Sequence, residues 1–502
     1  MQALGRFWLV VLLLSPVVAL VALPPFGQRM VTLIGIYALM GLGYQLVFGQ
    51  LGALNLAQGA LFGIGAYAAA LAGLPVAPLA AAIPAALAAA LTLRLQSHYF
   101  ALATLALASL VNLVALHAES LTGGANGLAG FAAGMSRGPS LLVVVWAILI
   151  AGVVLYARLF AGTLGERARL LREAPLVAAT LGIDAGRWRL VLFVLGGALA
   201  GLAGAFSAAL SGVVSPEVTG FPLMVLCLSL VVLGGTRHPM GAVLGATLAV
   251  CLPELLRELQ GAWLLGYAVA TLAVVLWAPE GLAGLCDRWR GAGSPKPPVP
   301  GLPASLPRAA GPRRLALQQV SKRFGGVEAL QDVSLSLERG EIVGLIGANG
   351  SGKTTLLNVI NGLDPIDQGA ILLDGRHLER LPAHAIARMG IARTFQAAML
   401  AGDSKSANLA RALARGGSLL LLDEPAAGLA DEERRELAVL LRQLRTQDYG
   451  VLIVDHDIEL LSAVCDRLVC LDRGRIIAAG SPAEVRADAH VRASFLGLAE
   501  AA

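Results

Sequence analysis

Lysine is absent from the first 293 residues of this 502-residue chain, and charged residues of all kinds make up only 14% of the whole sequence. These 293 residues contain 14 arginines and 9 acidic residues, whereas the remaining 209 contain 24 basic and 24 acidic ones, so the net charge of +5 belongs to the N-terminal part. Hydrophobic residues make up 57% of the chain, more than is usual for a soluble protein. No basic stripe with interleaved aromatic residues is present, so the composition argues against nucleic-acid binding and indicates a membrane protein.

Cysteine is scarce, and its spacing matches no metal-binding pattern. The five cysteines are Cys227, Cys251, Cys286, Cys465 and Cys470. Three lie in or beside apolar segments and two in a strand-like stretch near the end, so we expect reduced, buried thiols.

Ten apolar segments are candidates for membrane-spanning helices, which need about 20 residues each. They are Phe7–Leu23, Val31–Phe48, Ala53–Ala72, Val76–Leu95, Tyr99–His117, Leu141–Phe160, Leu190–Leu210, Pro222–Leu233, Gly241–Leu259 and Trp263–Ala278. The first has no convincing small-residue cleavage site and is followed by further apolar segments, so it is interpreted as a retained helix and not as a signal peptide. The stretch around Gly52–Gly65 is rich in alanine and glycine and is compatible with a re-entrant or broken helix. We therefore expect ten membrane spans, give or take about two.

The arginines indicate which side of the membrane the connecting segments face. Six of the 14 lie between Arg158 and Arg189, and Arg288 and Arg290 follow the last apolar segment. Because positive residues favour the cytoplasmic side, we expect both regions in the cytoplasm. The segment Gly291–Pro312 is rich in Pro, Gly, Ala and Ser and is typical of a linker. From Leu315 onward, strand-like and helix-like segments alternate as in a soluble α/β domain.

A phosphate-binding loop is the most specific motif in the sequence. The apolar run Glu341–Gly347 leads directly into GANGSGKTT, which matches G-x-x-x-x-G-K-[ST] between a strand and a helix. Glycines let backbone N–H groups approach phosphate oxygens, and the following helix N-terminus favours negative charge. Lys353 is expected to reach the β- and γ-phosphates of ATP, and Thr354 to hold Mg²⁺. The predicted nucleotide-binding residues of the loop are Gly347, Asn349, Gly350, Ser351, Gly352, Lys353, Thr354 and Thr355.

An acidic pair follows a second apolar run. Asp423 and Glu424 come directly after the four leucines Leu419–Leu422. Beside a phosphate-binding loop, Asp423 is predicted to orient Mg²⁺ and Glu424 to polarise the attacking water as general base.

The C-terminal part resembles the ATP-binding-cassette (ABC) ATPases, specifically those of branched-chain amino-acid importers. The resemblance is carried by the loop and by KRFGG (Lys322–Gly326), ARTFQ (Ala392–Gln396), LLLLDEPAAGL (Leu419–Leu429) and VDHD (Val454–Asp457). It implies that Phe324 stacks on adenine, that Gln396 is the Q-loop residue and a further candidate Mg²⁺ ligand, and that His456 lies near the γ-phosphate. We therefore expect an all-α polytopic membrane domain over residues 1–290, a linker over 291–312, and an α/β P-loop NTPase (ABC ATPase) domain over 313–502.

The cassette departs from that family between Gln396 and Asp423, which are only 27 positions apart. In the resembling family this interval is several times longer and holds a helical subdomain followed by an LSGGQ-type signature. Here LAGD (Leu400–Asp403) is the candidate remnant of the signature, and the helical subdomain is expected to be absent. Because that signature completes the partner's ATP site, we expect at best one competent and one degenerate site in a heterodimer of cassettes.

The N-terminal part resembles the permease subunit of the same importers. The segments that carry the resemblance are Gly41–Leu71, Thr122–Leu128 and Leu171–Ala205. Small residues such as Gly63, Gly65 and Gly201–Gly204 are expected to permit close helix packing. The stretch Glu173–Asp184 is similar to the coupling helix, with Leu176, Val177, Ala179 and Leu181 as its docking face. Five polar residues in apolar surroundings either line a pathway or bond neighbouring helices, and they are Asn55, Gln58, Asn112, His117 and Asn126.

The resemblance implies ATP-driven import of a branched-chain or related small amino acid, with urea or short amides as alternative substrates. The expected partners are a second permease, a second ABC ATPase, a periplasmic substrate-binding protein and membrane lipid, but no nucleic acid. The expected location is the bacterial inner membrane, with the ATPase domain in the cytoplasm. The other interpretation is a nucleotide-binding regulatory subunit or decayed paralogue that does not transport.

Overall fold

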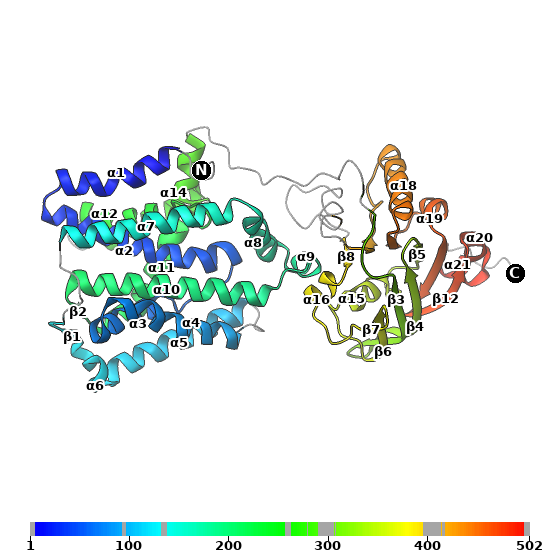
Figure 1. The fold of residues 1–502 in the computed structure, drawn as a ribbon, viewed down its shortest axis with the longest axis horizontal. Coiled ribbons are helices and arrows are strands. Elements are labelled where there is room, and N and C mark those ends of the chain that lie inside the picture. The colour runs from blue at the N-terminus through cyan, green and yellow to red at the C-terminus, as the bar shows by residue number, and fades with distance from the viewer. Residues whose placement is uncertain are drawn as a thin grey trace. The chain divides into compact units, whose positions relative to one another are not determined.

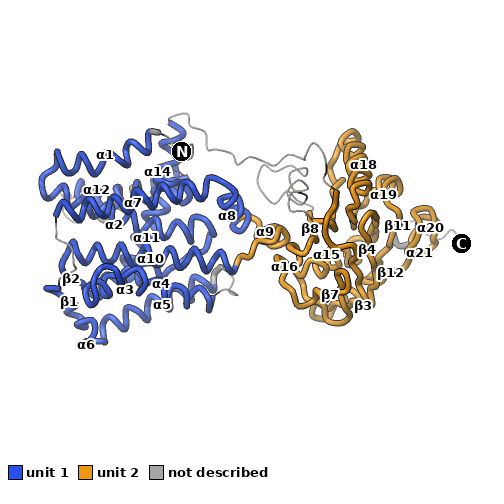
Figure 2. Tube along the Cα trace, viewed as in Figure 1, with its two compact units in different colours: residues 1–172, 186–297 blue, residues 173–185, 298–502 orange. Residues whose placement is uncertain are grey.

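Two compact units make up the chain, one formed by residues 1–172 and 186–297 and the other by residues 173–185 and 298–502 (Figure 2). The structure is a computed structural model, and it describes residues 6–92, 97–131, 138–256, 263–278, 280–289, 306, 308–394, 413 and 417–495. The segment 173–185 belongs to the second unit, although the chain on either side of it belongs to the first.

The described part of the first unit is almost wholly helical (Figure 1). Its longer helices are α1 (Arg6–Ala22), α2 (Pro25–Tyr44), α3 (Gln58–Ala72), α4 (Ala77–Thr92), α5 (Ser97–His117), α7 (Pro139–Phe160), α8 (Thr163–Glu173), α10 (Ala185–Ser211), α11 (Phe221–Gly234), α12 (Gly241–Leu255), α13 (Trp263–Trp277) and α14 (Gly281–Trp289). Each of the ten apolar segments found in the sequence overlaps one of these helices.

Five helical segments among the described residues are long and apolar enough to cross a membrane. They are Pro25–Gly49, Leu74–Thr92, Tyr99–His117, Pro139–Phe160 and Ala185–Ser211. Four further apolar helices are shorter, between 10 and 17 residues.

The helix that begins at Pro25 is interrupted where the sequence indicated a break. A π-helical turn, η2 (Gln45–Gly49), follows α2, and no helix covers residues 52–57 before α3 begins. Asn55 organises this break, because its Oδ1 accepts from the backbone N–H of Ala57 at 2.9 Å and its Nδ2 donates to Gln58 Oε1 at 3.0 Å. Gln58 Nε2 in turn donates to the carbonyl of Gly196 in α10 at 3.1 Å. Both side chains are buried, so they satisfy the freed backbone of a broken helix.

The other three of the five candidate polar residues differ in exposure and in hydrogen bonding. Asn112 donates to Thr219 Oγ1 at 2.8 Å, which ties α5 to the short helix η5 (Pro216–Thr219). His117 lies at the exposed end of α5, with Nδ1 3.0 Å from the Leu113 carbonyl. Asn126 is exposed in the short helix η4 (Gly124–Asn126).

Glycine allows α3 and α10 to approach within backbone contact. A Cβ at Gly65 would lie 2.1 Å from the carbonyl oxygen of Gly201, and one at Gly204 would lie 1.9 Å from the carbonyl oxygen of Phe62. Real side chains never come so close, so the packing expected from these small residues is confirmed.

The second unit holds two sheets with helices packed against them. A six-stranded sheet has the order β12-β11-β5-β10-β9-β8, and a four-stranded antiparallel sheet has the order β4-β3-β6-β7. The strands are β3 (Arg314–Phe324), β4 (Val327–Glu338), β5 (Ile342–Ile346), β6 (Gln368–Leu373), β7 (Arg376–His377), β8 (Ile391–Arg393), β9 (Leu419–Asp423), β10 (Gly450–Val454), β11 (Arg467–Asp472) and β12 (Arg475–Gly480). The helices are α9 (Pro175–Thr180), α15 (Lys353–Ile360), α16 (Ala383–Arg388), α18 (Asp431–Thr446), α19 (Ile458–Val464), α20 (Pro482–Ala487) and α21 (Ala489–Phe495).

The central strands of the six-stranded sheet run parallel. β8, β9, β10, β5 and β11 pair in parallel, and only β12 is antiparallel to its neighbour. Every residue of β5, β9 and β10 is buried, as expected for strands covered on both faces. The membrane-protein and α/β classes expected from the sequence are both present.

Candidate functional site

The carboxyl ends of four neighbouring parallel strands bring the predicted site residues together. β5 leads into the phosphate-binding loop, β10 into His456, and β9 ends at Asp423 and Glu424. β8 runs parallel to β9 and ends at Arg393. Because the strands are adjacent and parallel, residues separated by more than 100 positions meet at one edge of the sheet, where ligands bind in open α/β folds.

The lysine of the phosphate-binding loop forms hydrogen bonds with backbone carbonyls of the same loop. Lys353 Nζ donates to the carbonyls of Gly347 at 2.7 Å and Ala348 at 2.8 Å, and the lysine is buried. Burial lowers the pKa of Lys353, while the nearby carboxylates of Glu424 and Asp423 oppose that shift. A phosphate group placed here would give the ammonium group an anionic partner in place of two carbonyls.

Two further features of the loop fit a phosphate. The hydroxyl of Ser351 is buried and has no hydrogen-bond partner among the described residues, so it is available to a ligand oxygen. Gly352 has φ +107°, and a Cβ there would lie 2.5 Å from the carbonyl of Ala329 on β4. The eight-residue helix α15 begins at Lys353, so its free backbone N–H groups face the same place.

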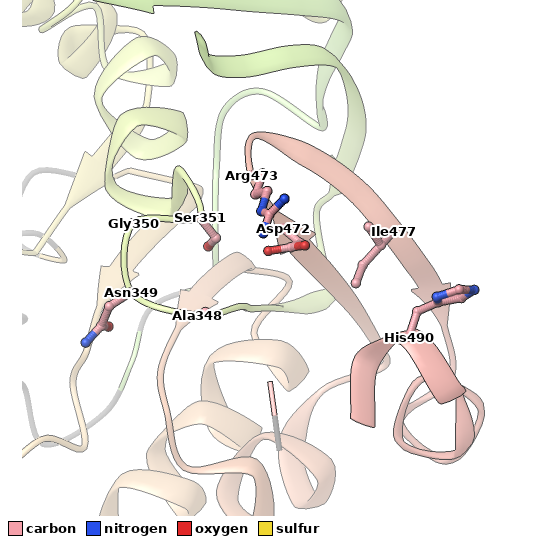
Figure 3. A pocket seen from close by; sticks show the side chains of 8 residues that line it. All are labelled: Ala348, Asn349, Gly350, Ser351, Asp472, Arg473, Ile477 and His490. Carbon is pink, nitrogen blue, oxygen red and sulfur yellow. The ribbon is translucent and has the colours of Figure 1, made fainter. Parts of the chain in front are cut away.

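A cavity of about 640 Å³ borders this loop. Figure 3 shows it between the loop, the turn that joins β11 to β12, and α21. Its lining residues are Ala348, Asn349, Gly350, Ser351, Asp472, Arg473, Ile477 and His490. Asn349 and Gly350 are exposed, so the predicted phosphate-binding residues open onto space large enough for a ligand.

Glu424 and His456 are in contact. His456 Nε2 lies 3.0 Å from Glu424 Oε1. The backbone of Glu424 has φ +47°, in the left-handed region, and its N–H donates to the Val454 carbonyl at 2.7 Å. Such a conformation costs about 1–3 kcal/mol in a residue with a side chain and is concentrated at functional sites.

Asp455 was not singled out in the sequence, yet it joins the two loops that carry this pair. Its Oδ2 accepts from the backbone N–H of Ala426 at 2.9 Å, and its Oδ1 accepts from those of His456 at 2.8 Å and Asp457 at 3.1 Å. The side chain is buried. The sequence signals for it were its place in the VDHD segment and its position directly after the apolar strand β10.

Arg393 also went unrecognised as a site residue, although it lies in the ARTFQ segment. Its Nη2 donates to Asp423 Oδ2 at 2.9 Å and its Nη1 to Asn358 Oδ1 at 2.7 Å. Burial lowers the pKa of Arg393, and the hydrogen bond and charge of Asp423 counteract that effect. The predicted Mg²⁺ residue Asp423 is therefore held by a buried cation.

The remaining predicted residues lie at the periphery of this edge or outside the described part of the chain. Phe324 is 47% exposed at the end of β3, and Lys322 Nζ lies 5.1 Å from its ring centroid. Thr354 is exposed and Thr355 half-buried in the first turn of α15. Gln396 and the LAGD segment lie outside the described residues.

The donors present suit Mg²⁺ bound mainly by phosphate and water. Asp423 and Thr354 offer hard oxygen atoms, which Mg²⁺ prefers. The residues that the structure describes contain no cluster of three or more His, Cys, Asp or Glu that would hold a metal on its own.

Within the second unit, segment 173–185 packs against α16 and β8. Arg388 Nε on α16 donates to the Gly182 carbonyl at 2.9 Å, and His384 Nε2 lies 3.5 Å from Asp184 Oδ2. Val177 and Leu181 are buried as predicted. The prediction for Leu176 is wrong, since it is 50% exposed, and Ala178 and Ile183 are buried instead. A six-residue helix that starts at Pro175 has too few turns for periodicity to define its buried face.

Comparison with known proteins identifies both units. Residues 28–278, half of the chain, match the family model described as branched-chain amino acid transport system / permease component, and residues 330–405 match that of the ABC transporter. The chain therefore belongs to the branched-chain amino-acid transport permease family. It carries an ABC transporter ATPase in the same polypeptide.

Several relatives match the ATPase part. The high-affinity branched-chain amino acid transport ATP-binding protein LivG of Salmonella typhimurium is 32% identical over 248 residues, which cover 36% of this chain and 97% of LivG. The lipopolysaccharide export system ATP-binding protein LptB of Escherichia coli K12 is 31% identical over 233 residues, with the same two coverages. A solved ATP-binding cassette of an ABC transporter in its ADP conformation is 23% identical, with a TM-score of 0.35, and covers 37% of this chain and 99% of that one.

The alignment with LivG runs over 248 positions but covers only 36% of the 502 residues here, about 180. Part of LivG therefore has no counterpart, which agrees with the short interval between Gln396 and Asp423.

Proposed function

We propose that this chain is a fused permease and ATPase subunit that imports a branched-chain or related small amino acid, using ATP. The observation that carries the proposal is the meeting of Lys353, Asp423, Glu424 and His456 at the carboxyl edge of one parallel sheet. The permease family and the LivG relative support the substrate class, because both are named for branched-chain amino-acid transport.

Different residues would bind the phosphates, the adenine ring and the Mg²⁺ of the nucleotide. Lys353 would leave the carbonyls of Gly347 and Ala348 and bind the β- and γ-phosphates, and Ser351 and the loop backbone would donate to phosphate oxygens. Phe324 would stack on the adenine ring. Thr354, Asp423 and Gln396 would hold Mg²⁺, which when bound supplies positive charge against the phosphates.

Glu424 would accept a proton from the attacking water as that water bonds to the γ-phosphorus, while the bond between this phosphorus and the bridging oxygen to the β-phosphate breaks and ADP leaves. His456 is 3.0 Å from Glu424 and would orient that carboxylate and donate to a γ-phosphate oxygen.

The contact between segment 173–185 and α16 supports a route for coupling. The segment connects α8 to the 27-residue helix α10, so a movement of α16 on ATP binding would be transmitted to both helices. Because α16 precedes β8 and Gln396, this route requires no helical subdomain between Gln396 and Asp423.

The proposal includes a location and partners. The chain would lie in a bacterial inner membrane among lipids, with the ATPase in the cytoplasm. It would assemble with a second permease, a second ABC ATPase that supplies an intact signature, and a periplasmic substrate-binding protein.

ATP hydrolysis by the chain purified with its partner cassette tests the catalytic assignment. Glu424→Gln is expected to lower turnover by two orders of magnitude or more, on the order of what removing a general base costs. Lys353→Ala is expected to abolish nucleotide binding at this site. Glu432→Gln is the matched control, because Glu432 is exposed on α18. Equal turnover in wild type and Glu424→Gln would overturn the assignment.

A second candidate is a nucleotide-binding regulatory subunit without transport, and the short interval between Gln396 and Asp423 favours it. Uptake by proteoliposomes separates the two. Leucine uptake that depends on ATP supports import, urea or amide uptake would change the substrate, and Lys353-dependent nucleotide binding without uptake would establish the regulatory role.

A further inference from the structure

A buried polar network connects Asp423 to two other elements of the ATPase. Arg393 at the end of β8 donates through Nη2 to Asp423 at the end of β9 and through Nη1 to Asn358 in α15, at 2.9 and 2.7 Å. Asn358 Nδ2 donates onward to Asp364 Oδ2 at 2.8 Å. The side chains of Arg393 and Asp423 are 1% and 9% exposed. The Arg393–Asp423 pair is therefore almost wholly buried, whereas Asn358 and Asp364 are half-buried.

The geometry restrains the Arg393 guanidinium in its plane. Its two terminal nitrogens bond to partners on different elements, so neither rotation nor translation is possible without losing a bond. A lysine keeps the positive charge but presents a single nitrogen and cannot reproduce this planar fork. The orientation of the Asp423 carboxylate is fixed as a result, because its Oδ2 is the atom that accepts.

The association of β8 with β9 does not by itself require a buried ion pair such as Arg393 and Asp423. Replacing a buried ion pair by apolar residues of similar volume is often neutral or stabilising. Carboxylates that bind metal ions, in contrast, are regularly held by hydrogen bonds from residues behind them. A buried arginine directly behind the candidate Mg²⁺ carboxylate fits this second use.

We propose that Arg393 is a positioning residue that fixes the Asp423 carboxylate in the orientation that binds the Mg²⁺ of the nucleotide. Arg393 touches neither nucleotide nor metal and acts through Asp423 alone. This inference rests on the proposed function, because it requires that Asp423 serves Mg²⁺.

Nucleotide binding without hydrolysis gives the test. The full chain in detergent is titrated with trinitrophenyl-ADP by fluorescence, first in EDTA and then at increasing Mg²⁺. In Arg393→Gln, the dissociation constant in EDTA is expected to stay within about twofold, because the phosphate-binding loop is intact. The Mg²⁺ concentration that half-saturates the change in nucleotide affinity is expected to rise roughly 10–100-fold, the usual effect of losing a group that orients a metal ligand.

Four further variants complete the design. Arg393→Lys is expected to lie between wild type and Arg393→Gln. Asp423→Asn is expected to abolish the Mg²⁺ effect, and Arg376→Gln, at an exposed position on β7, to behave as wild type. Asn358→Ala removes the second anchor of Arg393 together with the bond to Asp364, but it leaves the bond between Arg393 and Asp423 in place. It is expected to raise the Mg²⁺ midpoint by a smaller factor. If Arg393→Gln does not fold, the Mg²⁺ midpoint of Asn358→Ala tests the role of Arg393 in its place.

The outcomes separate this inference from the proposed function. An unchanged or lowered Mg²⁺ midpoint in Arg393→Gln, with the effect lost in Asp423→Asn, overturns the role of Arg393 alone. Full restoration by Arg393→Lys shows that charge suffices and overturns the orienting role. An unchanged midpoint in Asp423→Asn overturns the assignment of Asp423 to Mg²⁺ and the inference with it.

Discussion

Replacing Asp455 with asparagine is expected to disconnect the loops that carry Glu424 and His456. The Asp455 carboxylate accepts three backbone N–H groups, from Ala426 in one loop and from His456 and Asp457 in the other, at 2.8–3.1 Å. Asparagine has one acceptor oxygen in place of two. Either the N–H of Ala426 or those of His456 and Asp457 would therefore face an NH₂ group instead of an acceptor. A buried donor left without an acceptor costs about 1–3 kcal/mol, and the loss of charge weakens the remaining bonds.

Chemical denaturation and ATP hydrolysis measure the two consequences. The free energy of unfolding of the ATPase unit is expected to fall by about 1–3 kcal/mol. Turnover is expected to fall on the order of 10–100-fold, because displacing a catalytic group by about 1 Å has effects of this size.

The neighbouring carboxylate supplies the control. Asp457 caps α19 by accepting from the Leu460 N–H at 2.9 Å, and asparagine caps a helix about as well as aspartate. The Oδ2 of Asp457 also lies 3.3 Å from Arg434 Nε, in a partly exposed ion pair of the kind that contributes little to stability. Asp457→Asn is therefore expected to change both quantities little. If Asp455→Asn matches Asp457→Asn in stability and turnover, the bridging role of Asp455 is refuted.

Two further predictions concern packing and coupling. Gly65→Ala places a Cβ 2.1 Å from the Gly201 carbonyl and is expected to destabilise the first unit by about 1–3 kcal/mol, seen as a lower melting temperature in detergent. Gly162→Ala, where no atom lies within 4 Å, is the control, and equal melting temperatures would contradict the close packing of α3 and α10. Arg388→Ala removes the bond to Gly182 and is expected to lower the amount of substrate transported per ATP hydrolysed in proteoliposomes. An unchanged ratio, equal to that of Arg376→Ala on β7, would show that this contact does not transmit the movement.

Sequence motifs account for the parts of the candidate site that are local in the chain. The phosphate-binding loop is one continuous segment between a strand and a helix, and Asp423 and Glu424 follow a run of four leucines. Such motifs specify their own backbone, so spacing was enough to find them.

Arg393 and Asp455 could not be assigned in the same way. Arg393 bonds to Asp423, 30 positions away, and Asp455 bonds to Ala426, 29 positions away. These contacts exist because β8, β9 and β10 lie side by side, and strand order cannot be obtained from the spacing of residues within each strand. A charged residue at the end of a buried strand was the available signal.

In the first unit, the sequence located the helices but could not decide the roles of polar residues. Asn55 and Gln58 were compatible with a pathway or with bonds between helices. Their partners are the Ala57 N–H and the Gly196 carbonyl, and the second of these lies 138 positions away. Only the packing of α3 against α10 distinguishes the two roles.

Hydrolysis of ATP by the Glu424→Gln variant is the most direct measurement of whether this ATPase domain is catalytically active. The chain is purified with its partner cassette, and turnover is compared with that of wild type and of Glu432→Gln. Glu424→Gln is expected to bind ATP normally and to lose turnover, whereas Glu432→Gln is expected to keep both. Turnover in Glu424→Gln equal to that of wild type, or its absence from all three proteins, would contradict the claim that this shortened ATPase hydrolyses ATP.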